Sequence, residues 1–163
     1  LVGFGIGSTS CGDPEPGVVE GAVYLAEDLS SEQSLGNIEV RLVEDGPQVD
    51  SMLLKICPDT GRAIATDPAA RQSARAMRSR ILTAHVLQSA TADSLAGFVL
   101  DSVPRGRYRL WADTVIGDRS WTWLALVYVP GGGDTTQLSL TNANADDDPY
   151  RCYADRVTEL GER

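Results

Sequence analysis

The stretch from residue 94 to residue 114 constrains the fold of this chain more than any other. Two short apolar runs, at 97–100 and 107–111, flank the triplet Pro104-Arg105-Gly106. Strand-like runs on either side of a Pro/Gly turn are typical of a β-hairpin. Proline fixes φ in the turn and glycine accepts a positive φ. The stretch therefore predicts two antiparallel strands, with the chain reversing at Gly106.

Further segments have strand-like sequences separated by turn signals. They are residues 18–25, 38–43, 52–57, 81–90, 120–130 and 135–140. In the second of them Ile38, Val40 and Leu42 alternate with charged residues, as in a strand with one face in water. Together with the hairpin this gives seven to eight strands. The pattern predicts a mainly β fold, an antiparallel β-sandwich.

Two short helices are expected beside the strands. Asp67 and Pro68 suit the N-cap and first position of an amphipathic helix through residue 78. In the tail, Asp148 and Pro149 play the same roles, and apolar residues recur at helical spacing until Gly161. We therefore expect a short inserted helix and a short C-terminal helix.

The size and charge of the chain restrict its organisation and partners. Its 163 residues fit one domain, and a net charge of −9 speaks against nucleic acid, which requires a basic surface. We expect a leader and linker at 1–17, a sandwich domain at 18–141 with an insertion at 45–90, and a helical tail at 142–163. The N-terminal ten residues are apolar and resemble the end of a signal peptide.

Cys11 follows small residues, in a pattern that resembles the lipobox of bacterial lipoproteins. That motif usually has Leu where this chain has Ser8. In one interpretation Cys11 is a lipidation site that anchors the protein to a membrane. In the other, the segment is a flexible leader with an ordinary cysteine.

Four segments together resemble the carboxypeptidase-regulatory-like and Cna-B-like domains. They are GVVEGAV at 17–23, GNIEVRL at 36–42, ADSLAGFVL at 92–100 and VPRGRYRL at 103–110. The resemblance omits residues 45–90 and the tail. It implies a transthyretin-like β-sandwich outside the cytoplasm, acting as a stalk, spacer or interaction module, with no catalytic residues. Lys55, the sole lysine, does not lie where Cna-B-like domains place their isopeptide lysine, so we expect no such bond.

If Cys11 carries lipid, Cys57 and Cys152 remain. An even pair in an exported chain favours a disulfide, here between the insertion and the tail. The alternatives are two free thiols in a cytoplasmic protein, or a pairing that includes Cys11.

The side chains expected to bind a partner are aromatic or basic. Trp121 and Trp123 lie on one face of a regular strand, and Leu124 and Leu126 on the other. A strand that is apolar on both faces needs cover from within the chain, from a partner protein or from a stacked sugar. The basic stripe of the inserted helix is either a solvated face or a docking site for an acidic partner. The predicted partner-binding residues are Trp111, Trp121, Trp123, Arg71, Arg75 and Arg78.

No pattern in the sequence indicates catalysis, a metal or a cofactor. His85, the only histidine, has no ligands at zinc spacing and is expected to be structural. The aspartates near residue 146 suit a calcium loop or the cap of the tail helix. We therefore expect a non-enzymatic, lipid-anchored accessory subunit of a larger membrane or envelope complex, such as a respiratory or photosynthetic one. It would lie on the periplasmic or extracellular face of a bacterial membrane. The alternative is a carbohydrate-binding module with surface tryptophans.

Overall fold

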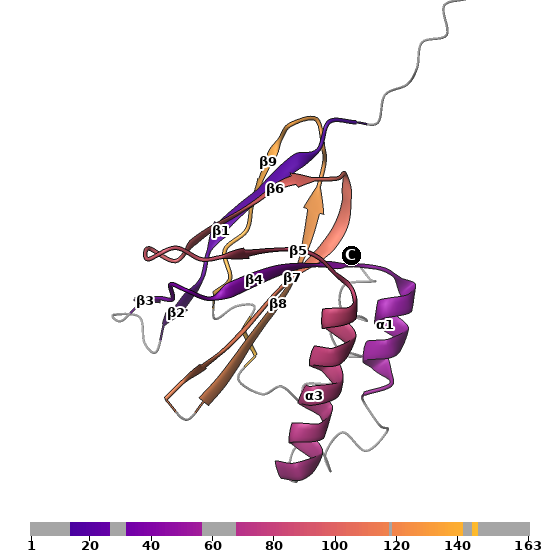
Figure 1. Cartoon of the computed structure of the whole chain (residues 1–163), viewed down its shortest axis with the longest axis vertical. Coiled ribbons are helices and arrows are strands. Elements are labelled where there is room, and N and C mark those ends of the chain that lie inside the picture. The colour runs from indigo at the N-terminus through magenta and orange to yellow at the C-terminus, as the bar shows by residue number, and fades with distance from the viewer. Residues whose placement is uncertain (1–13, 27–31, 57–67, 118, 142–144, 147–163) are drawn as a thin grey trace, which may run out of the picture.

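The computed structural model describes residues 14–26, 32–56, 68–117, 119–141 and 145–146. These residues form a β-sandwich with two helices on one side (Figure 1). One sheet has the strand order β6-β1-β9 and the other has the order β10-β8-β7-β4-β5. The described part of the sandwich thus contains eight strands, and the prediction of a mainly β sandwich is confirmed.

The elements have the following bounds. The small sheet contains β1 (Gly17–Ala22), β6 (Gly97–Val103) and β9 (Thr135–Gln137). The large sheet contains β4 (Glu39–Glu44), β5 (Val86–Thr91), β7 (Gly106–Ile116), β8 (Arg119–Val129) and β10 (Ala145–Asp146). A separate pair is formed by β2 (Tyr24–Ala26) and β3 (Glu32–Ser34), and the helices are α1 (Pro47–Leu54) and α3 (Pro68–Ala84). The pairs are antiparallel except β1–β9, which is parallel.

The main core lies between the two sheets. Phe98 and Leu100 of β6 enter it from the small sheet, and Leu42, Leu110 and Trp123 enter it from the large sheet. All five side chains are buried. Because residues of a strand alternate between its faces, the same strands leave a second face of the large sheet to be covered.

The helices cover that second face. Val49 and Leu53 of α1 and Leu82 of α3 pack with Val43 and Trp111 in a smaller apolar cluster. The part of the large sheet beneath the helices is therefore covered on both faces, and the molecule has three layers there. Figure 1 shows α1 and α3 side by side, at the end of the molecule opposite the start of β1.

The predicted hairpin is wrong, because β6 and β7 belong to different sheets. β6 pairs with β1, whereas β7 pairs with β4 and β8. The link through Pro104 therefore crosses between the sheets, so that Phe98 and Leu110 meet across the core. Tyr108 Oη donates a hydrogen bond of 2.8 Å to the Pro104 carbonyl and fixes the crossing. Glycine at 106 relieves crowding there, since a Cβ would lie 3.1 Å from Tyr108 Oη.

The insertion is more helical than its sequence suggested. The predicted strand at 52–57 is wrong, because residues 47–54 form α1, with Pro47 in the first turn and with Val49 and Leu53 buried one turn apart. The inserted helix is confirmed and extends to Ala84, since Leu82 in its last turn packs against Val43 and Trp111 of the large sheet. The predicted strand at 81–90 is correspondingly reduced to β5.

Several predictions fall on residues outside those described. These are the lipidation site Cys11, the Cys57–Cys152 disulfide and the C-terminal helix. The turn after β8 is described and confirmed, since Gly131, Gly132 and Gly133 all have positive φ.

Candidate functional site

A groove of about 380 Å³ lies between α3 and the strands β7 and β8. Its lining includes two arginines of α3, Arg75 and Arg78, and residues of the large sheet. The sheet residues that matter here are Trp111, Asp113, Ser120, Trp121 and Thr122. Four of the six predicted partner-binding residues, Trp111, Trp121, Arg75 and Arg78, thus line one groove.

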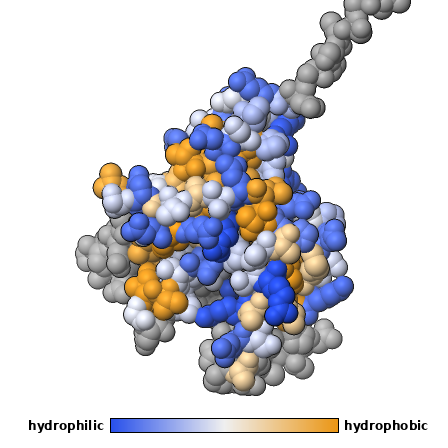
Figure 2. All heavy atoms as spheres, in the orientation of Figure 1, coloured by the Kyte–Doolittle hydropathy of each residue, from blue (hydrophilic) through white to orange (hydrophobic). Residues whose placement is uncertain are grey.

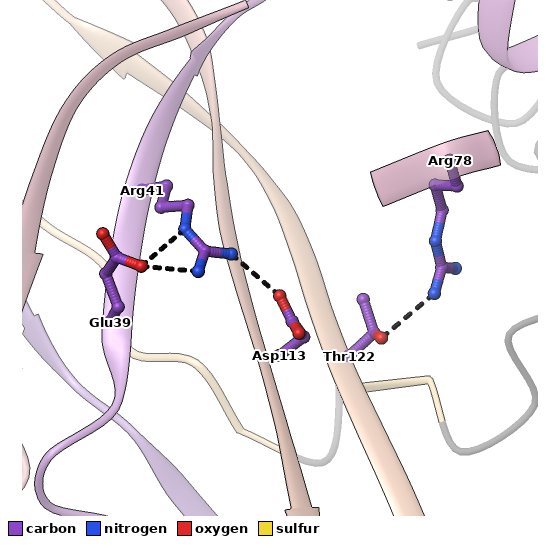
Figure 3. A network of polar contacts seen from close by, with 5 residues as sticks. All are labelled: Glu39, Arg41, Arg78, Asp113 and Thr122. Atoms are coloured by element: carbon purple, nitrogen blue, oxygen red, sulfur yellow. Dashed lines mark hydrogen bonds and ion pairs between the residues drawn. The ribbon is translucent and has the colours of Figure 1, made fainter. Parts of the chain in front are cut away.

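The two arginines of the helix reach the sheet through hydroxyl groups. Arg75 Nη1 donates a hydrogen bond of 2.6 Å to Ser120 Oγ, and Arg78 Nη2 donates one of 3.0 Å to Thr122 Oγ1 (Figure 3). Residues three apart on a helix are neighbours on its surface, and residues two apart on a strand share a face. The spacing of the arginines on α3 therefore matches that of the hydroxyls on β8.

Arg41 of β4 does not line the groove but contacts two residues that do, Trp111 and Asp113. Its guanidinium lies 4.4 Å from the centre of the Trp111 ring. It pairs with Glu39 at 2.5 Å and with Asp113 at 2.8 Å (Figure 3). Burial by itself lowers the pKa of Arg41, but the hydrogen bonds and charges of the two carboxylates outweigh it and raise that pKa. The hydrogen bond from Arg41 lowers the pKa of Glu39. This network fixes Asp113 and Trp111 beside the groove.

Arg75 has capacity to bind a further group. Its Nε is buried and has no hydrogen-bond partner among the described residues. A guanidinium carries five N–H donors in a plane, which suits a carboxylate or another oxyanion. The groove therefore offers directed positive charge on the surface of an acidic protein.

For two of the three tryptophans the structure selects one of the expected alternatives, cover from within the chain. Trp123 has no exposed surface and Trp111 is 2% exposed. Trp123 lies in the core between the sheets, and Trp111 lies under the helices. Only Trp121 is partly exposed. Burial thus removes Trp111 and Trp123 from any surface on which a sugar could stack.

The basic stripe also differs from its prediction. Arg78 is only 3% exposed, so it is part of the helix–sheet contact and not a solvated face. Arg75 is partly buried, and the side chain of Arg71 lies outside what the structure describes. Sequence reasoning missed Ser120, Thr122 and Asp113. A signal existed in 120–123, where hydroxyl residues alternate with tryptophans.

A second hollow, of about 390 Å³, is lined by residues including Glu20, Asp93 and Phe98. The carboxylates of Glu20 and Asp93 already accept hydrogen bonds from within the chain. Glu20 accepts a hydrogen bond of 2.9 Å from Gln137 Nε2, and Asp93 Oδ1 accepts from two backbone N–H groups of its own loop. It therefore offers less unused binding capacity than the groove does.

Large exposed apolar side chains are spread over the molecule. Leu87 lies on β5, Leu95 in the loop before β6, Val115 on β7 and Tyr128 on β8. Figure 2 shows apolar residues in separate patches with hydrophilic residues between them. In this view no continuous apolar face competes with the groove as a binding surface.

His85 Nδ1 lies 3.3 Å from Glu44 Oε2, at the end of α3. In the described part of the chain, no three His, Cys, Asp or Glu side chains converge in a way that could hold a metal ion. Neither described helix has the length and apolar character needed to cross a membrane.

Comparison with known proteins finds similarity only among solved structures. No family profile matches the chain, and no curated protein matches it either. The structure of PA1324 from Pseudomonas aeruginosa, to which carbohydrate binding is attributed, shares 20% identity over 80% of this chain and 90% of that one, with a TM-score of 0.49.

Two pilins show weaker similarity. GBS52, the minor pilin of Streptococcus agalactiae, shares 11% identity over 79% of this chain and 45% of its own, with a TM-score of 0.39. BcpA, the major pilin subunit of Bacillus cereus, shares 11% identity over 78% of this chain and 30% of its own, with a TM-score of 0.40. The chain thus spans less than half the length of these pilins. Because all three TM-scores are below 0.5, the fold assignment rests on the sheets and core of this chain.

Proposed function

We propose that this chain is a non-catalytic binding module, an accessory subunit of a larger membrane or envelope protein complex. It would contact its partner through the groove between α3 and the β7–β8 strands. The observation that carries the proposal is the buried Nε of Arg75 in the wall of that groove, which has no hydrogen-bond partner among the described residues. A partly buried guanidinium with unused donors gains most from an acidic group that desolvates it further.

The remaining charged groups described on the same face support this reading. Arg41 is held by two carboxylates, and Arg109 pairs with Asp45 and Asp50 beneath α1. These arginines stabilise the helix-covered face itself. Arg75 is therefore the one we assign to partner binding.

A lipid on Cys11 would orient the groove. The described chain begins at Pro14, and Gly132 N donates a hydrogen bond of 2.6 Å to the Glu15 carbonyl, next to the start of β1. That end lies opposite the helices (Figure 1). Three residues span at most about 10 Å. An anchored protein would hold its sandwich close to the bilayer and direct the helices away from it, toward a partner on the outer face of the membrane.

Affinity capture from detergent-solubilised membranes of the source organism tests the groove. We expect Arg75→Glu to reduce recovery of a co-purifying protein at least tenfold. Arg80→Glu is the matched control, because Arg80 is an exposed residue of the same helix and does not line the groove. A wild-type chain that is recovered alone and monomeric, or equal recovery with both variants, would refute the proposal.

Intact mass of the native protein tests the anchor and the disulfide together. We expect a mature chain that starts at an acylated Cys11 and is lighter by two hydrogens than its reduced form. A Cys57→Ser variant should lose that mass difference, and a Cys11→Ala variant should leave the membrane fraction. An unmodified Cys11 in membrane preparations would remove the lipid anchor from the proposal.

A further inference from the structure

We propose that the groove is a docking site for an acidic segment of this same chain, residues 146–148, which an external partner has to displace. The inference rests on the proposed function, because it concerns the regulation of the same groove. Its first support is the position of β10, which ends beside the arginines.

The register of β10 determines which residues of β8 the segment would oppose. β10 runs antiparallel to β8, with Ala145 opposite Trp123 and Asp146 opposite Thr122. An antiparallel ladder advances by one residue on each strand, so a docked segment that continued this ladder would bring Asp147 opposite Trp121 and Asp148 opposite Ser120. Directly opposed residues share a face of the sheet. In the proposed docking, position 148 would therefore join position 146 on the face of Thr122 and Ser120, and position 147 would lie on the face of Trp121.

The two hydroxyl groups on that face lie next to the guanidinium groups of α3. Ser120 Oγ accepts a hydrogen bond from Arg75, and Thr122 Oγ1 accepts one from Arg78. A carboxylate at position 148 would therefore be next to Arg75, whose Nε has no partner among the described residues. Bonds between a guanidinium and a carboxylate are roughly twice as strong as neutral ones.

The segment matches the groove in charge and in register. It supplies three consecutive aspartates, and the proposed register would put two of them on the face of the arginines. Since β10 already holds one end of the segment on the edge of β8, docking needs little further loss of chain entropy. An acidic partner would compete with a tethered acidic segment, so that binding by the groove depends on release of the tail.

Native-state proteolysis of the purified full chain tests the inference. Trypsin cleaves after Arg151, three residues beyond Asp148, and the yield of the fragment that ends at Arg151 follows the population of the undocked tail. We expect Asp148→Asn and Arg75→Gln each to raise the cleavage rate about fivefold, the equivalent of about 1 kcal/mol. The double variant should show about the same fivefold increase, because both substitutions remove one contact.

Asp147→Asn is the matched control. It removes the same charge one position away, on the opposite face, and should change the rate by less than twofold. Equal effects of the two asparagine substitutions would refute docking in this register. So would a double variant whose effects multiply to about 25-fold. Near-UV circular dichroism of each variant verifies that the tryptophans of the fold remain packed.

The comparison of the Arg75 and Asp148 single variants with the double variant needs no partner protein, so its outcome is independent of the affinity capture from membranes. Coupling between Arg75 and Asp148 without any captured partner would support the docked tail and refute the proposed function. If partner capture depends on Arg75 but Arg75 and Asp148 show no coupling, the proposed function would be supported and the docked tail refuted. If both hold, Asp148→Asn should increase partner capture about fivefold.

Discussion

Arg109 connects the helical layer to the large sheet, and its removal should destabilise the fold strongly. It lies on β7, 8% exposed at the side chain, and Nε donates a hydrogen bond of 2.9 Å to Asp45 Oδ1. Its Nη2 also contacts Asp50 in the first turn of α1. Asp45 is only 5% exposed. Arg109→Met keeps the apolar stem of the side chain and leaves that buried carboxylate without its main partner.

The magnitude follows from the burial of the pair. Removing one member of a buried ion pair costs about 3–5 kcal/mol. Arg107 Nη2 still lies 3.2 Å from Asp45 Oδ2, so we expect the lower end, about 3 kcal/mol. For a chain of this size that is a decrease in Tm of about 6–12 °C. Urea unfolding followed by tryptophan fluorescence measures it, with an unchanged m-value.

Two further variants separate charge from packing. Arg107→Met removes the same charge from the same carboxylate, but Arg107 is 68% exposed, so the loss should stay below about 1 kcal/mol. Adding Asp45→Asn to Arg109→Met should recover about 1–2 kcal/mol, because it removes the stranded charge. A loss below 1 kcal/mol for Arg109→Met, or no recovery in the double variant, would show that this ion pair does not hold the helical layer.

Two other predictions concern the crowded positions of the sandwich. Gly21→Ala would bring a Cβ to 2.0 Å from the Leu138 carbonyl oxygen and should lower the free energy of unfolding in urea by about 3 kcal/mol. Gly46→Ala is the control, because Gly46 has open space around it, and it should change that free energy by less than about 1 kcal/mol. Equal losses in the two variants would contradict the β1–β9 packing. Tyr108→Phe removes the hydrogen bond to Pro104 and should cost about 1 kcal/mol at pH 7. Burial raises the pKa of Tyr108 in the folded protein. The stabilisation by Tyr108 is therefore complete below the pKa of the unfolded chain, about 10, and falls as pH rises beyond it. If stability above pH 10 depended on pH in the same way in Tyr108→Phe, this role of Tyr108 would be contradicted.

The site was partly accessible to sequence reasoning. The i, i+3 spacing of Arg75 and Arg78 on a predicted helix was visible in the sequence, and so was the alternation around Trp121. Their convergence was not, because it depends on α3 lying across β8, a contact between residues more than forty positions apart. The same contact buries Arg78, which a helix seen in isolation would expose.

What the sequence alone determined is local. Apolar alternation specified most of the strands, Pro68 marked the start of α3, and the Gly131–Gly133 run marked a turn, because these features depend on neighbouring residues. Only the tertiary structure decided which strands pair. The link at Pro104 could have closed a hairpin, but a sandwich needs Phe98 and Leu110 in opposing sheets so that both are removed from water. That long-range requirement overrides the local turn signal.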